Sequence, residues 1–435
     1  MSFFKELNQF MMMGARAHAK WELEMSNNIL HSRSRKLILC LLLIPIIFGG
    51  FAFADTVAGN LPTMLGGKTA YAPAFYTPTI FFASIGVGIV AGLITGCIGA
   101  GGGFIIAPAL MSVGVKGILA VGTDLFHIFA KAIMGSVLHR KLGNISVGLA
   151  GVFLIGSIGG ATLGGWVNRT LYELNPILSD AFITTIYVLM LGFLCSYALL
   201  DFFRSTKAAA AQKEAGGTIL APDITNIARR IQSVNLPPMI TFDEGVTPGG
   251  RKISWIFLVM SGFVVGMAAA IMGVGGGFLT FPIFVYTLGV SSATTVGTDI
   301  FQIIFTAGYA GLSQYAVYGF IFYTLAMGML LGSLFGIQIG SLITKVVSGP
   351  TICGLYAVAT SAGFVNRLFA LPSKLASMGY IPMSEATGKM LETVGTWIFF
   401  VVLGAFAIWV FYIFFTNISV LKGEDHAHTD KGVTA

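Results

Sequence analysis

The chain has 435 residues, of which 55% are hydrophobic and only 10% are charged. Soluble domains carry about a quarter charged residues, so this composition excludes a soluble globular protein and indicates an integral membrane protein. Many separate apolar runs of about twenty residues make it polytopic and all-α, since a transmembrane β-barrel would alternate polar and apolar positions. The net charge of +7 is expected to report membrane topology rather than nucleic-acid binding.

The chain begins with a polar leader at residues 1–36, which ends in a basic cluster and is expected to lie in the cytoplasm. Residues 37–54 are apolar and predict a first transmembrane helix. A signal peptide is the alternative, because the small residues at 52–54 resemble a cleavage site. Whether residues 1–54 are removed therefore stays open.

Two strings in the centre of the chain occur twice. GAGGGFIIAP at Gly99–Pro108 is followed by VGTDLF at Val121–Phe126. GVGGGFLTFP at Gly273–Pro282 is followed, at nearly the same interval, by VGTDIF at Val296–Phe301. Two long matches in the same order indicate an internal duplication.

The duplication predicts repeat 1 at residues 76–203 and repeat 2 at residues 254–370. Each repeat has a full helix leading to the glycines, a half-length or re-entrant segment, a helix with the TD string, a glycine-rich helix and a closing helix. The expected elements are 80–98, 104–113, 117–138, 147–167 and 181–203 in repeat 1, and 255–272, 278–288, 293–315, 320–342 and 351–370 in repeat 2.

The remaining segments suggest the topology. Residues 204–253 are polar and rich in Lys and Arg, so we expect a cytoplasmic loop. A further helix at 394–416 has no counterpart in repeat 1, and residues 417–435 form a polar tail. The distribution of basic residues makes repeat 2 enter the membrane from the side opposite to repeat 1. We therefore expect inverted repeats, about ten full transmembrane helices, and both termini on the cytoplasmic side of the inner membrane.

The glycine stretches are the first candidates for function. Glycines that interrupt a membrane helix expose backbone N–H groups, which are tolerated at that depth only along a polar cavity. The positive end of the following helix would favour an anion there. The alternative is that the glycines only permit close helix crossing. A dinucleotide site is disfavoured, because an apolar helix and not a strand precedes each stretch. The candidate substrate-binding glycines are Gly101, Gly102, Gly103, Gly275, Gly276 and Gly277.

The TD helices add polar side chains. Spacing at i, i+3 and i+7 places on one face Asp124, His127 and Lys131 in the first copy, and Asp299, Gln302 and Thr306 in the second. Lys131 either attracts an anion or neutralises Asp124. The two aspartates either carry protons for coupling or cap the broken helices. Thr123 and Thr298 offer hydroxyls to a substrate oxygen or to a backbone carbonyl. Gln302 and His127 complete the candidate substrate-binding set.

At these residues the sequence resembles the TauE/SafE family, the sulfite exporter family. The resemblance rests on the duplicated glycine strings, the VGTD strings, Lys131 and the HRKLGN turn, and it covers roughly residues 76–370. It implies a secondary transporter of a small inorganic or organic sulfur anion, such as sulfite or a sulfonate, bound near the glycine breaks between two inverted halves. The anion, the direction, the coupling ion and homo-oligomer formation stay open.

Other function classes are less well supported by the sequence. It contains no nucleophile–base set and no cluster with metal-ligand spacing, so we expect neither an enzyme nor a bound cofactor. A passive anion channel would use the same site without coupling residues. A membrane scaffold or assembly subunit would instead use the 204–253 loop to recruit a partner.

Overall fold

The computed structural model describes residues 59–65, 67, 78–98, 102–141, 145–215, 225–243, 250–343, 346–347 and 349–417. The chain divides into the units Met1–Gly59 and Asn60–Ala435, and all the elements below belong to the second unit. Four expectations lie outside the described residues: the leader, the first helix at 37–54, Gly101, and all of the tail beyond residue 417.

Helices make up nearly all of the described chain. In order, the elements are η1 (Thr63–Leu65), α4 (Pro78–Ile98), α5 (Gly103–Ser112), α6 (Gly117–Lys141), α7 (Val147–Leu174), α8 (Pro176–Ala215), α9 (Asn226–Gln232), β1 (Met239–Phe242), β2 (Arg251–Ser254), α10 (Trp255–Met272), α11 (Gly277–Pro282), η2 (Ile283–Leu288), α12 (Ser292–Tyr309), η3 (Ala310–Tyr315), η4 (Ala316–Tyr318), α13 (Tyr323–Ile343), α14 (Gly349–Ser377) and α15 (Glu385–Thr416).

Seven helices in the described part of the chain are long and apolar enough to cross a membrane, against about ten expected for the whole chain: α4, α7, α8, α10, α13, α14 and α15. The TD helices α6 and α12 are not among them, and in α12 polar residues interrupt the apolar run. Two shorter apolar helices cover Gly103–Ser112 and Gly277–Leu288, where the half-length segments are expected. The protein is therefore an all-α polytopic membrane protein in its described transmembrane part.

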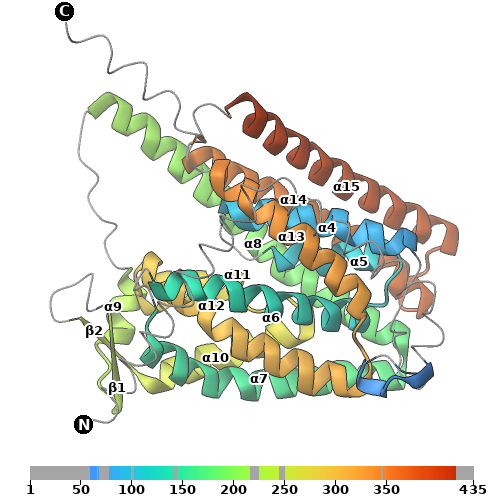
Figure 1. The fold of residues 1–435 in the computed structure, drawn as a ribbon, viewed down its shortest axis with the longest axis horizontal. Coiled ribbons are helices and arrows are strands. Elements are labelled where there is room, and N and C mark those ends of the chain that lie inside the picture. Colours follow the sequence, from blue (N-terminus) through green and yellow to red (C-terminus); the bar gives the residue numbers. More distant parts are fainter. Residues whose placement is uncertain are drawn as a thin grey trace, which may run out of the picture. The chain divides into compact units, whose positions relative to one another are not determined.

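Glycines allow helices of the two repeats to pack backbone against backbone. Figure 1 shows α4 beside α13, and α10 beside α7. A Cβ atom at Gly92 would lie 2.5 Å from the carbonyl oxygen of Ser333, and one at Gly160 would lie 2.0 Å from that of Phe263. Only glycine fits at such distances. Both pairs run in parallel, because positions along the two partners advance together: Gly88, Gly92 and Gly96 meet Met329, Ser333 and Ile337 in that order, and Gly156, Gly160 and Gly164 meet Val259, Phe263 and Met267.

A single methyl group should test this packing. Gly156→Ala on α7 would bring its Cβ within 1.9 Å of the Val259 carbonyl oxygen. We expect a loss of stability of about 1–3 kcal/mol, because the helices must separate to admit the methyl group. Gly151→Ala on the same helix meets no atom within 4 Å, and alanine favours a helix over glycine by about 1 kcal/mol. Thermal unfolding of both variants in detergent is the measurement, and equal melting temperatures would contradict the packing.

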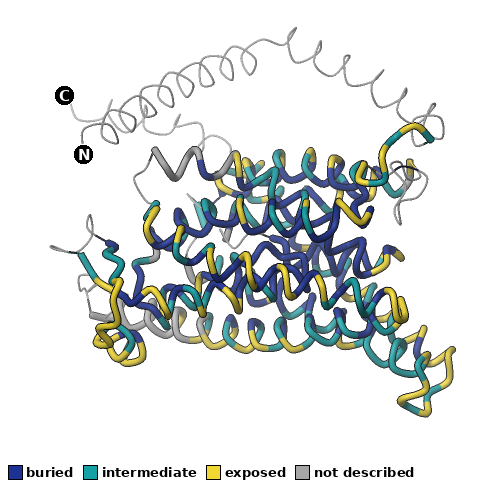
Figure 2. The backbone as a smooth tube through the Cα atoms, turned by 90° about the horizontal axis from the view of Figure 1, so that it is seen from below, coloured by how far each residue is buried: buried dark blue, intermediate teal, exposed yellow. Residues whose placement is uncertain are grey.

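The TD helices α6 and α12 also contact each other, but they run in opposite directions. A Cβ at Gly308, near the end of α12, would lie 2.9 Å from the Phe129 ring. A Cβ at Gly122, near the start of α6, would lie 3.1 Å from Tyr315, which lies beyond α12 in η3. Rising positions on one helix thus meet falling positions on the other. Figure 2 shows that buried residues concentrate on the inward sides of the helices and exposed residues on the outward sides.

The last helix, α15, is longer than the expected 394–416. It begins at Glu385 because the hydroxyl of Ser384 accepts a hydrogen bond from the Thr387 amide and so caps its first turn. It packs mainly on α14 and exposes many apolar side chains, as expected for a peripheral helix in lipid.

The segment between the repeats contains structure of its own. Helix α8 continues to Ala215, through a run of alanines with Lys and Glu that favours a helix. Strands β1 and β2 pair antiparallel, with Met239 opposite Ser254 and Phe242 opposite Arg251. Among the described residues this hairpin is the exception to the expected all-α structure, and it ends directly at the start of α10.

This segment is docked onto the end of η2. The Thr225 hydroxyl donates to the carbonyl oxygen of Tyr286 at 2.5 Å, and the Gln232 amide donates to that of Leu288 at 2.7 Å. The guanidinium of Arg251 donates to the Gly289 carbonyl oxygen at 2.6 Å. These bonds satisfy carbonyl groups that the end of a helix leaves without partners. The central segment thereby fixes the end of the second half-length segment.

Candidate functional site

The two glycine breaks lie against each other. Gly102 precedes α5 with φ of +57°, and Gly276 precedes α11 with φ of +91°. These left-handed conformations are open to glycine but strained for other residues. A Cβ at Gly103 would lie 3.2 Å from the carbonyl oxygen of Val274, so the first break touches the second. Segments about 170 residues apart in sequence thus meet at one place, as the duplication suggests.

A lysine and a threonine lie at the first break. The Lys131 ammonium donates to the hydroxyl of Thr95 at 3.3 Å, and that hydroxyl donates to the Ala91 carbonyl oxygen at 2.7 Å. A Cβ at Gly102 would lie 2.6 Å from the same hydroxyl oxygen. Thr95 is not among the residues predicted from the sequence. Its one signal is a hydroxyl placed two turns before the glycines in an otherwise apolar helix.

Asp124 and His127 are both fully buried on α6. His127 Nδ1 lies 3.5 Å from Asp124 Oδ1, and among the described residues neither oxygen of Asp124 has a hydrogen-bond partner. Lys131 lies close enough to interact electrostatically with Asp124. The expected face of α6 therefore forms a cluster of ionisable groups that leads to the first break.

The orientation of His127 follows from its other nitrogen. Nε2 lies 2.9 Å from Ser333 Oγ, and the single proton of that hydroxyl is donated to the Gly88 carbonyl oxygen at 3.1 Å. Ser333 must then accept from Nε2–H, so a neutral His127 presents the lone pair of Nδ1 to Asp124. Two hydrogen-bond acceptors, Asp124 Oδ1 and His127 Nδ1, therefore face each other, and one proton between them would join them in a hydrogen bond.

On the second TD helix, α12, uncharged side chains take the places of His127 and Lys131 and form a chain of hydrogen bonds to Asp299. The amide of Gln302 donates to Asp299 Oδ1 at 2.9 Å, and the Thr306 hydroxyl donates to Gln302 Oε1 at 2.7 Å. Thr306 in turn lies 2.8 Å from the hydroxyl of Ser157. Ser157 on α7 and Ser333 on α13 occupy the same position in the duplicated glycine-rich helices. Each repeat thus supplies a serine that contacts the TD helix of the other repeat: Ser333 contacts His127, and Ser157 contacts Thr306.

Thr123 and Thr298, the threonines of the two TD strings, each bond the backbone just before a glycine-rich helix. Both are fully buried. Thr123 Oγ1 accepts from the backbone amide of Phe322, just before α13, at 3.0 Å, and Thr298 Oγ1 accepts from that of Ser146, just before α7, at 3.0 Å. The partner in each case is a backbone N–H of the other repeat. Their hydroxyls position the glycine-rich helices.

The far end of α5 is held by Arg367, a fully buried residue of α14 that was not predicted from the sequence. Its guanidinium donates to the Ser112 hydroxyl at 2.7 Å and to the Pro108 carbonyl oxygen at 3.3 Å. A cation at the C-terminal end of a helix complements the helix dipole. Arg367 therefore fixes the half-length helix that starts at the first break.

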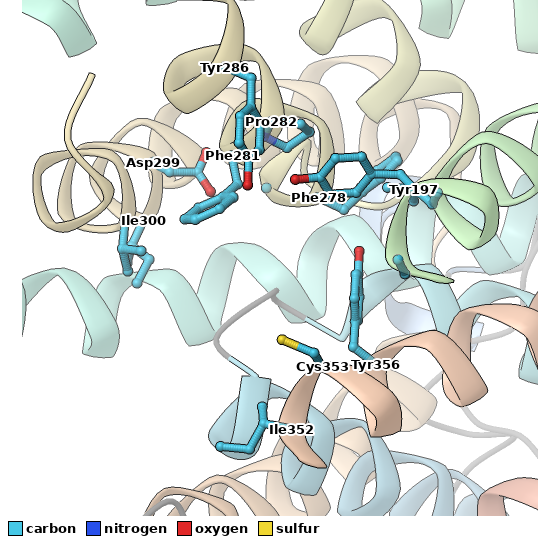
Figure 3. A pocket seen from close by; sticks show the side chains of 14 residues that line it. Tyr197, Phe278, Phe281, Pro282, Tyr286, Asp299, Ile300, Ile352, Cys353 and Tyr356 are labelled. Carbon is cyan, nitrogen blue, oxygen red and sulfur yellow. The ribbon is translucent and has the colours of Figure 1, made fainter. Parts of the chain in front are cut away.

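A cavity of about 350 Å³ opens beside the second break, and Gly277 and Asp299 are among its lining residues. Figure 3 shows the aromatic side chains around it. Lys131, His127 and Gln302 do not line this cavity. In the residues that the structure describes, no group of His, Cys, Asp and Glu has the arrangement of a metal site.

The sequence profile of the family described as "Sulfite exporter TauE/SafE" matches residues 84–367. The chain is 24% identical over 274 residues to the probable membrane transporter protein YunE of Bacillus subtilis, which covers 61% of this chain and 89% of that protein. It is 26% identical over 255 residues to the probable membrane transporter protein YjnA of the same organism, covering 59% and 87%. No solved structure matches the chain.

Proposed function

Because the chain belongs to the sulfite exporter TauE/SafE family, we propose that it is a secondary transporter of a small sulfur-containing anion, such as sulfite, a sulfonate or a related oxyanion. Its relatives are named as probable membrane transporters. The chemistry at the first glycine break favours an anion within that class. We place the protein in the inner membrane, with both termini in the cytoplasm.

The observation that carries this proposal is the position of the Lys131 ammonium at the first break, within 3.3 Å of the Thr95 hydroxyl. An oxyanion at this place would accept charge-assisted hydrogen bonds from Lys131, whose ammonium Thr95 holds in position. The glycine backbone around Gly102, at the start of α5, would add N–H donors and the positive end of the helix dipole. In this proposal Gly101 and Gly103 let the anion approach the backbone. Gly275, Gly276, Gly277 and Gln302 form the facing side.

We propose further that the two repeats are inverted. Equivalent helices of a parallel duplication would run in the same direction, whereas α6 and α12 run in opposite directions. The exchanged contacts support the same relation, since Thr123 meets the start of α13 and Thr298 meets the start of α7. Two-fold symmetry in the membrane plane produces such reciprocal pairs. Rocking of one repeat against the other would then expose the site to each side in turn.

Proton coupling would use the contact between Asp124 and His127. A proton between Asp124 Oδ1 and His127 Nδ1 would turn two facing acceptors into a hydrogen bond. It would also reduce the negative charge near the anion that Lys131 binds. Loss of that proton would leave the carboxylate to compete for Lys131 and favour release of the anion. Asp299, with its neutral partner Gln302, has no equivalent arrangement.

A flux panel in proteoliposomes tests the proposal. Purified protein is reconstituted, and uptake of sulfite, sulfate, thiosulfate and sulfoacetate is followed with and without a pH gradient. We expect saturable transport of at least one sulfur anion, accelerated by the gradient. Flux that is not saturable and ignores the gradient would instead indicate a passive channel. Absence of flux for every anion would leave the scaffold function and overturn the transporter assignment.

A further inference from the structure

The cavity beside the second break has an unusual wall. It lies among α8, α11, η2, α12 and α14, and its volume of about 350 Å³ is in the range of small-molecule sites. Figure 3 shows the hydroxyl groups of Tyr197, Tyr286 and Tyr356 directed into this space, with Asp299 on one side. The lining residues are Leu194, Tyr197, Ala198, Gly277, Phe278, Phe281, Pro282, Tyr286, Val296, Asp299, Ile300, Ile352, Cys353 and Tyr356.

Charge in the cavity comes from Asp299 alone, because the other lining residues are uncharged. Asp299 is only 8% exposed. The side chain that bonds it, Gln302, is neutral, and no ion pair joins it to a basic group in the part of the chain that the structure describes. A buried carboxylate is costly unless a positive charge compensates it. A cation bound in the cavity would supply this compensation for Asp299.

The residues that line the cavity indicate which kind of ligand it would bind. An anion would meet the charge of Asp299 and has no Lys, Arg or His to bind. A metal ion would need several closely spaced oxygen ligands, whereas most of this wall is aromatic or aliphatic. A primary ammonium group has three N–H donors, which match a carboxylate and phenol oxygens. The rings of Phe278 and Phe281 offer faces that attract a cation and cover a short alkyl chain.

We propose that this cavity binds a primary alkylammonium group, with Asp299 as its counter-charge and the tyrosine hydroxyls as acceptors. The cavity shares Gly277 with the facing side of the proposed anion site, but Lys131 and His127 do not line it, so the proposal goes beyond the transport function. Phe281 and Tyr286 are exposed at the cavity while Asp299 is nearly buried, which places the carboxylate at its inner end. The ligand would enter with its ammonium group leading.

Equilibrium binding of propylammonium to the purified full-length protein in detergent tests this site by isothermal titration calorimetry. We expect saturable binding that Asp299→Asn weakens by about tenfold or more, since one charge-assisted bond is lost. Tyr356→Phe removes one hydroxyl and should weaken it severalfold. Asp180→Asn is the control, because this partly buried carboxylate bonds the Gly117 amide and Lys374 on other elements and does not line the cavity. It should bind propylammonium like the unaltered protein.

Two further probes complete the test. Tetramethylammonium has the same charge but no N–H donor, and it should bind more weakly than propylammonium. Propanesulfonate has the same chain length and the opposite charge, and it should not compete. Absence of propylammonium binding, equal affinity in Asp299→Asn with an unchanged melting temperature, or competition by propanesulfonate would each overturn the proposal. The calorimetric measurement involves no flux. Absence of propylammonium binding would therefore leave the proposed anion transport unaffected, and absence of anion flux would leave the proposed ammonium site unaffected.

Discussion

Replacement of Lys131 with glutamine is expected to reduce transport of the sulfur anion by about tenfold or more in reconstituted vesicles, while the protein stays folded. Glutamine keeps a polar N–H donor on a similar side chain but removes the positive charge that lies at the first break. The anion would then lose its charge-assisted bond, whereas the packing of α6 would be kept. Initial uptake rates and the affinity for the anion, measured together with the melting temperature, are the readouts.

Two controls separate an anion-binding lysine from one that only neutralises Asp124. Lys374→Gln removes an equal charge from the pair with Asp180 on α14 and should leave uptake close to normal. The double variant Asp124→Asn/Lys131→Gln removes both charges of the α6 pair. Restored transport in that double variant would assign Lys131 to charge neutralisation. Unchanged affinity in the single variant would remove Lys131 from the site altogether.

Valine in place of Gly102 is expected to abolish transport. Gly102 has a left-handed backbone, and its Cβ would lie 2.6 Å from both the Ala91 carbonyl oxygen and the Thr95 hydroxyl. The side chain would therefore occupy the place where Lys131, Thr95 and the start of α5 converge. Backbone strain alone costs a non-glycine residue about 1–2 kcal/mol. The steric conflict adds to it and cannot be relieved without moving α4.

Gly114→Val is the matched control for this change. Gly114 also has a left-handed backbone, with φ of +93°, but a Cβ there meets nothing within 4 Å. Both variants pay the strain, and only the one at Gly102 fills the break. Membrane yield and elution in gel filtration should show that both insert, and vesicle uptake should survive only in the Gly114 variant. Equal transport by the two variants would contradict a site at the break.

The duplicated strings predict the local structure well, because the information is carried by neighbouring residues. The half-length segment expected at 104–113 is α5, Gly103–Ser112. The second copy differs, since the 278–288 segment divides into α11 and the wider turn η2 after Pro282. Proline lacks the amide that would continue the regular pattern. The similar widening at η3 has no comparable signal in the sequence.

The site was predictable only in part. The face with Asp124, His127 and Lys131 follows from helical spacing, and the structure keeps these residues together. The partners could not be predicted, because Thr95, Ser157 and Ser333 are ordinary hydroxyl residues until tertiary packing brings them to the TD helices. The cavity was missed for the same reason. The part of its wall that comes from α8 and α14 carries no motif, and only tertiary packing brings it to α11 and α12.

The cross-packing of α4 with α13 also bears on how this protein is made. During synthesis α4 enters the membrane early, yet its glycine face is covered only when α13 follows, and Ser333 lies 245 residues beyond Gly88. Until then the close-packing face of α4 has lipid or an insertion factor as its neighbour. Non-local pairing of this kind makes assembly slow. The final packing of the helices is therefore expected to be a late, cooperative step, which begins only when the last third of the chain has entered the bilayer.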